Sequence, residues 1–205
     1  MGGTLGPLVQ GSFVRLRQRV LVSVMFGFAF LLGALITFNL ASFLNVRLIQ
    51  PWVSTEWRTW ITVGGFALLS ILDLIAIRRN TYCSLTLSRQ TPKSLARHRG
   101  MLFVAAFWGF DLGTAISTFR VTAMTWGALL LVILGWAPPW IALSYAAGFV
   151  IPLLFLMWAG RFPRREQEQA FESLRQMLDR REPAQWISAG LLAFGAILTA
   201  LGKLG

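Results

Sequence analysis

The sequence predicts an all-α, polytopic integral membrane protein, a bundle of about five transmembrane helices of which the third is long and broken. Of its 205 residues, 56% are hydrophobic and only 13% are charged, whereas about a quarter of the residues in a soluble domain are charged. Uncharged or nearly uncharged runs of about 20 residues, the length that crosses the hydrocarbon core, recur along the chain. The 19 Lys and Arg residues lie almost entirely between these runs.

The first two apolar runs cover residues 20–44 and 59–77. Arginines precede the first run, as in a signal peptide, but its uncharged stretch is too long for a signal peptide core and no clear cleavage motif follows. We therefore expect a retained transmembrane helix. In the second run Asp73 is the only charge, and its position near the end favours a place among the head groups, paired with Arg78 or Arg79.

The third run, residues 101–137, is too long for one straight crossing. At 1.5 Å per residue it would reach about 55 Å, against a hydrocarbon core of about 30 Å. It contains Asp111 and Arg120, and Pro138 and Pro139 end it. It is therefore either two separate helices or one long element that is broken in the middle.

The rest of the chain predicts two further spans, residues 140–159 and 184–202, with Pro152 inside the first of them. Proline is tolerated in a membrane helix because neighbouring groups can satisfy the carbonyl that it frees. The polar stretch between these spans places apolar side chains on one helical face. We expect an amphipathic cytoplasmic segment over residues 164–181, lying on the membrane surface or on the protein.

The distribution of basic residues decides between one and two crossings of the third run. With one crossing, fifteen of the basic residues share the cytoplasmic side, as the positive-inside rule requires; they are Arg15, Arg17, Arg19, Arg78, Arg79, Arg89, Lys93, Arg97, Arg99, Arg161, Arg164, Arg165, Arg175, Arg180 and Arg181. With two crossings, the last six would lie outside. We therefore predict five crossings of a bacterial cytoplasmic (inner) membrane, with the N-terminus in the cytoplasm and the C-terminus outside.

The tryptophans agree with this topology, because aromatic side chains are enriched at the two membrane interfaces. Two of them, Trp158 and Trp186, are expected at the inner interface. The expected outer belt consists of Trp52, Trp57, Trp60, Trp136 and Trp140.

The middle of the third run is the candidate functional segment. A charge near the bilayer centre costs roughly 2.5–3.5 kcal/mol on insertion scales, so it needs a reason to be there. One interpretation is that Asp111 and Arg120 form an ion pair or bind lipid or a partner subunit; the other is that they line a polar cavity for a solute. The candidate polar site consists of Asp111, Ser117, Thr118 and Arg120, and two small residues expected to serve helix packing are Gly109 and Gly113.

Several function classes are disfavoured by the composition. The chain has one cysteine, Cys83, and one histidine, His98, so the sequence predicts no metal site and no cofactor. We expect no nucleic-acid partner, because the basic residues serve topology and contact anionic lipid head groups. No catalytic set is recognisable, so we predict that the chain is not an enzyme; the arginines of residues 78–100 leave open a lipid-linked phosphate substrate.

Three segments suggest a family resemblance: GFDLGTAISTFR at residues 109–120, SYAAGFVIPLLF at 144–155 and WISAGLLAFGAILTALG at 186–202. Their order resembles the membrane domain of the CcdA/DsbD thiol-disulfide transporters, within the wider LysE-like transporter group. That resemblance implies a basic cytoplasmic loop, a long broken helix, a proline-containing span and a short glycine-rich final helix, which is the topology deduced from charge.

The departures from this family are large. Its members relay electrons through two intramembrane cysteines, whereas this chain has Ser117, Thr118, Phe119 and Arg120 where the second cysteine motif would fall. A single thiol lacks the resolving partner that exchange requires. The first span would correspond to the family's second helix, so a counterpart of the first is missing. The resemblance therefore carries over no catalytic residue.

Two functions remain in competition. The first is a non-catalytic membrane subunit or assembly factor of a larger complex, which the small size and the few polar residues in the spans favour. The second is a CcdA/LysE-like transporter with a midplane polar cavity that has lost thiol-disulfide chemistry. The expected partners are the lipid bilayer with its anionic head groups and other membrane protein subunits.

Overall fold

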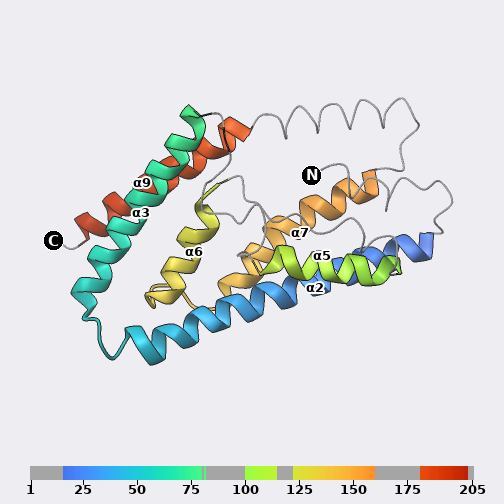
Figure 1. The fold of residues 1–205 in the computed structure, drawn as a ribbon, viewed down its shortest axis with the longest axis horizontal. Coiled ribbons are helices and arrows are strands. Elements are labelled where there is room, and N and C mark those ends of the chain that lie inside the picture. The colour runs from blue at the N-terminus through green and yellow to red at the C-terminus, as the bar shows by residue number, and fades with distance from the viewer. Residues whose placement is uncertain (1–15, 80, 82–99, 115–121, 160–180, 203–205) are drawn as a thin grey trace. The chain divides into compact units, whose positions relative to one another are not determined.

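A computed structural model describes residues 16–79, 81, 100–114, 122–159 and 181–202, and these are helical with short connections (Figure 1). No strand occurs within these ranges. The elements are α2 (Leu16–Leu44), a π-helix η1 (Asn45–Ile49), α3 (Thr55–Arg78), α5 (Met101–Gly113), α6 (Met124–Ile133), α7 (Ile141–Ala159) and α9 (Arg181–Leu201). The predicted all-α class is therefore confirmed.

Three helices are long and apolar enough to cross a membrane: Val20–Ile49, Thr55–Arg78 and Glu182–Leu201. Their lengths of 30, 24 and 20 residues meet the requirement of about 20 residues. Three apolar helical stretches are shorter: Met101–Gly113, Met124–Ile133 and Ile141–Pro152. By length and composition, the molecule is thus of the helical membrane type.

The third apolar run contains two separate helices, α5 and α6, between Met101 and Ile133. At about 1.5 Å per residue, neither helix is long enough to cross the hydrocarbon core. Glycine marks the end of each. Gly113 is the last residue of α5, and Gly135, two residues after α6, has a φ of 79°, a left-handed conformation that glycine adopts without a steric penalty.

The chain forms two compact units, which are described one at a time. Unit 1 comprises residues 1–36, 88–118 and 142–177; its described helices are the first part of α2, α5 and α7. The backbones of α2 and α5 touch: a Cβ on Gly109 would overlap the carbonyl oxygen of Phe26, and one on Gly113 that of Phe30. Gly33 on α2 meets α5 in the same way, at the carbonyl oxygen of Phe110.

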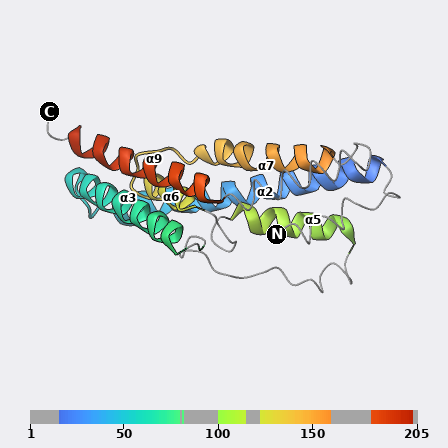
Figure 2. The same ribbon diagram turned by 90° about the horizontal axis from the view of Figure 1, so that it is seen from above.

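Aromatic rings join α2 to α7 within unit 1. The Phe30 ring, which is fully buried, stacks on Phe149 at 5.2 Å between centroids and tilts against Tyr145 at 5.5 Å. Such offset ring pairs stabilise packing beyond the area that they bury. Figure 2 shows α2 running between α5 and α7, in agreement with these contacts.

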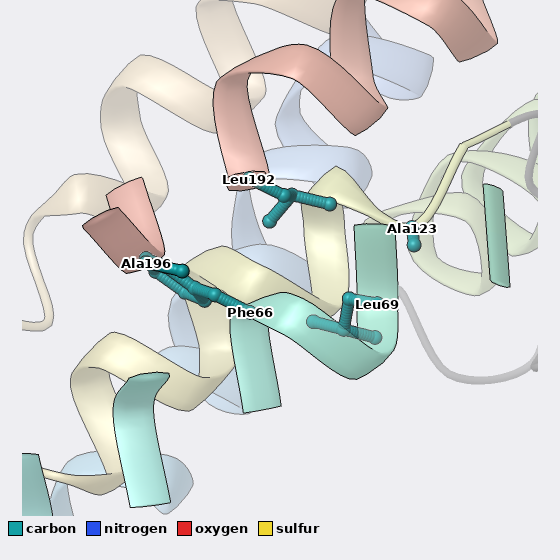
Figure 3. Close-up of a cluster of buried hydrophobic side chains, with 5 residues drawn as sticks. All are labelled: Phe66, Leu69, Ala123, Leu192 and Ala196. Carbon is teal, nitrogen blue, oxygen red and sulfur yellow. The ribbon is translucent and has the colours of Figure 1, made fainter. Parts of the chain in front are cut away.

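Unit 2 comprises residues 37–87, 119–141 and 178–205 and is built on α3 and α9, which lie side by side in Figures 1 and 2. The shorter α6 packs against this pair. The core of the unit consists of five buried residues, shown in Figure 3: Phe66, Leu69, Ala123, Leu192 and Ala196. Space for Phe66 comes from Gly195, where a Cβ would lie 2.9 Å from the ring.

Candidate functional site

The most distinctive polar group in the described residues is Asp73 on α3, whose side chain is fully buried. Its carboxylate accepts a hydrogen bond from the backbone N–H of Ala123, with N···O distances of 2.9 and 3.1 Å to its two oxygens. The hydroxyl of Ser188 on α9 donates to Oδ2 at 2.6 Å. One carboxylate therefore joins three segments of unit 2, and we call Asp73, Ser188 and the Ala123 N–H the Asp73 cluster.

This geometry corrects the sequence-based interpretation of Asp73. The side chain is buried in the helix packing, and its described donors are Ser188 and Ala123 instead of Arg78 or Arg79, both of which are exposed. The physical reason is the short helix α6, for which Ala123 is the N-cap residue. Its unpaired amides need an acceptor that the apolar surroundings do not supply.

Buried polar residues continue along the interface between α3 and α9. One turn before Asp73, the hydroxyl of Ser70 donates to the carbonyl of Ala189 at 2.9 Å. One turn before Ser188, the amide of Gln185 donates to the carbonyl of Thr81 at 2.9 Å. Gln185, Ser188 and Asp73 are each at most 1% exposed, so this polar row is enclosed by protein.

The opposite end of α6 is also held by α3. The guanidinium of Arg58 donates from Nη1 to the carbonyl of Leu134, the C-cap residue of α6, at 3.4 Å, and from Nη2 to Thr55 Oγ1 at 3.0 Å. A helix carries partial positive charge at its N-terminus and partial negative charge at its C-terminus. Asp73 and Arg58 therefore place the complementary charge at each end of α6, which fixes this helix on α3.

Only part of the candidate site deduced from the sequence falls within the described residues. Asp111 lies near the end of α5 with a half-buried side chain, and its backbone carbonyl accepts from Thr114 Oγ1 at 2.8 Å. Gly109 and Gly113 are the points where α5 meets the α2 backbone. Outside the described ranges are Ser117, Thr118, Arg120, Cys83, His98 and all of the predicted amphipathic segment 164–181 except Arg181, which is the first residue of α9.

The sequence singles out Asp73 as a lone acid but does not predict the residues that surround it. Its partners are 50 and 115 residues away in the chain, so no local motif joins them. The available signal was a single acid inside an otherwise uncharged run, together with Gln185 and Ser188 one helical turn apart in the last run. Within the described ranges, no group of three or more His, Cys, Asp or Glu residues is placed to hold a metal ion.

Comparison of the chain with models of protein families, with curated proteins and with solved structures finds no match.

Proposed function

We propose that this chain is a non-catalytic subunit or assembly factor of a larger protein complex in the bacterial inner membrane. The strongest support is that the buried polar side chains of unit 2 form hydrogen bonds between its helices. Asp73, Ser188, Ser70 and Gln185 each bond to another helix or its flanking backbone, so they hold the scaffold together. This is the chemistry of a structural component.

The outward faces of the same helices support an environment of lipid and neighbouring membrane helices. On α9, Ile187 and Phe194 are 63% and 59% exposed, and on α3 Leu68 is 57% exposed. Exposed apolar surface of this extent needs an apolar medium or partner. The proposed neighbours are therefore membrane-embedded subunits, with anionic head groups contacting the basic residues at the helix ends.

Photo-crosslinking tests this proposal. A crosslinking amino acid at Phe194, on the exposed face of α9, should capture one partner protein reproducibly in cells, whereas the same group at buried Leu192 is the matched control. Native mass spectrometry after mild solubilisation should show that partner at fixed stoichiometry, and deletion of this chain should reduce assembly of the partner's complex. A chain that runs alone and gives identical products at both positions would contradict the proposal.

The proposed topology has five crossings, with α5 and α6 contributing one crossing between them. Its support is the distribution of basic residues, which places the N-terminus and residues 78–100 and 161–183 in the cytoplasm. Single cysteines introduced in a Cys83→Ser background test it. Cysteines within residues 164–181 should react only after the membrane is permeabilised, whereas one at Gln50 should react from outside; labelling of 164–181 from outside would overturn this layout.

The interrupted third run favours a second candidate function, a CcdA/LysE-like transporter with a midplane polar cavity. Transporters build solute sites from short helices that end within the membrane, and the support here is that the third run contains two short apolar helices, α5 and α6. The residues that the sequence assigns to this function are Asp111, Ser117, Thr118 and Arg120. Complementation of a deletion phenotype tests it: Asp111→Asn and Arg120→Gln should each abolish complementation at normal protein level, and retained function in both would reject the transporter.

A further inference from the structure

Asp73 is a carboxyl group buried within a membrane-type helix pair, and its described partners are donors that carry no charge. The charged residues described on the elements packed around it are Glu56 and Arg58 near the start of α3, Arg78 and Arg79 at its end, and Arg181 and Glu182 at the start of α9, whereas α6 contributes none. Glu56 and Arg58 lie more than about 20 Å before Asp73 along the helix axis. Arg78, Arg79 and Glu182 are exposed. Along α3, Arg78 is about 7.5 Å beyond Asp73. The proton is the smallest ligand that can neutralise a carboxylate enclosed in this way.

We propose that the Asp73 cluster is a proton-binding site, at which the Asp73 carboxylate reversibly takes up one proton from water at the end of α3. This inference goes beyond the structural role proposed above, because it assigns a ligand to the cluster.

The hydrogen bonds of the cluster can serve both protonation states of the carboxyl group. In the ionised state, Ser188 donates to Oδ2 and Ala123 donates to the carboxylate. When Oδ2 takes up a proton, the new O–H donates to Ser188 Oγ across the same 2.6 Å. The serine hydroxyl then rotates and donates to the carbonyl four residues earlier, that of Ala184, an arrangement common for serine in helices. The charge of the site changes from −1 to 0, and each polar group keeps a partner.

The polar row along the helix pair provides access from one end only. From the end of α3, Thr81 and Gln185 lead to Ser188 and Asp73. Beyond Ser70, the core around Phe66, Leu192 and Ala196 is apolar. The buried hydroxyls of Thr59 and Thr62 on α3 donate to carbonyls of their own helix and do not extend the row. The row therefore connects the carboxylate with the side where α3 ends and α9 begins, so the cluster binds a proton without conducting it across.

Protonation has a structural consequence for α6. The carboxylate supplies the negative charge at the N-terminus of this helix, and the neutral acid does not. The backbone N–H of Ala123 then donates to a weaker acceptor, because hydrogen bonds to ionised groups are about twice as strong as those between neutral groups. The proton thus weakens the attachment of α6 to α3 at one end, while Arg58 holds the other.

Infrared difference spectroscopy of the full chain in liposomes tests the inference. The pH-dependent spectrum of the wild-type protein should contain one carboxyl C=O band that is absent in Asp73→Asn. The amide resonance of Ala123, followed by NMR, should titrate with the same midpoint. Ser188→Ala removes the donor to the ionised form and also the acceptor of the protonated form. Because the hydrogen bond to the ionised carboxylate is the stronger of the two, the midpoint should shift toward higher pH, by up to about tenfold in proton concentration.

Ser70→Ala is the matched control, because it deletes a hydrogen bond of the same α3–α9 interface that does not touch Asp73. It should leave the midpoint unchanged. If Asp73→Asn does not fold, the comparison of Ser188→Ala with Ser70→Ala still decides the matter. A titration that Ser188→Ala leaves unmoved, or the absence of any carboxyl band that titrates together with the Ala123 amide, would overturn the proton site.

Discussion

The two units bring their helices together in different ways. In unit 1, α2 and α5 meet backbone to backbone at Gly33, Gly109 and Gly113, and stacked rings join α2 to α7. In unit 2, a side-chain carboxylate and two serines bond across α3, α6 and α9. Close backbone approach depends on the absence of a Cβ, whereas polar attachment depends on every donor finding its acceptor. The contact between α2 and α5 is therefore sensitive to added side-chain volume, whereas the packing of α3, α6 and α9 is sensitive to the loss of hydrogen-bonding groups.

The largest effect is expected from added volume in unit 1. Gly113→Val places two methyl groups where even a Cβ overlaps the Phe30 carbonyl, so α5 must move away from α2. We expect the free energy of unfolding, measured by detergent titration of the purified protein, to fall by about 3 kcal/mol. The control is Gly148→Val on α7, where a Cβ meets nothing within 4 Å. If both variants lose the same free energy of unfolding, the close backbone contact at Gly113 is not what makes unit 1 sensitive to added volume.

A smaller effect is expected from lost chemistry in unit 2. Asp73→Ala leaves the Ala123 N–H and the Ser188 hydroxyl buried without this acceptor, which should reduce the free energy of unfolding by about 2 kcal/mol. Asp73→Asn keeps one acceptor oxygen of similar size and should cost about half as much. The same detergent titration measures both. If Asp73→Ala and Asp73→Asn reduce the free energy of unfolding equally, the hydrogen bonds of Asp73 do not stabilise the unit as proposed.

The smallest effect is expected at the other end of α6. Arg58→Gln removes the positive charge that faces the C-cap carbonyl of Leu134 at 3.4 Å, and should reduce the free energy of unfolding by about 0.5 kcal/mol. Hydrogen exchange of the amides of α6 should quicken toward its C-terminus only. Arg47→Gln, at an exposed arginine on the neighbouring π-helix, serves as the control and should leave α6 unchanged. Faster exchange along the whole helix would mean that Asp73 and Arg58 do not act at separate ends.

Much of the helical framework is predictable from the sequence, because the spacing of apolar and charged residues shows which segments can lie in lipid. The long apolar helices follow from uninterrupted hydrophobic runs. The start of α3 at Thr55, four residues before the predicted span, reflects Ser54, whose hydroxyl accepts from the Trp57 N–H at 3.4 Å and caps the helix outside the apolar run. A cap depends on local polar chemistry, which a hydropathy pattern does not contain.

The partners of individual residues were harder to predict. Gly109 and Gly113 stand out as small residues one turn apart, yet nothing in the sequence selects Phe26 and Phe30 as the residues that they meet. Asp73 was assigned to nearby arginines because they are close in the chain, whereas its donors belong to segments brought together by folding. Proximity in sequence is a poor guide wherever a short helix must find partners for its own ends.

The attachment of α6 to α3 at both ends also bears on how the chain is made. A ten-residue helix is too short to enter lipid by itself, and its free ends would face oil. During synthesis α3 emerges first, so it is already in place as a template when α6 leaves the ribosome. Ser188 arrives last, with α9, and closes the cluster. Assembly of this unit is therefore ordered along the chain, with α3 first, α6 second and α9 last. A chain truncated before α9 would hold α6 only through its contacts with α3, including those with Asp73 and Arg58.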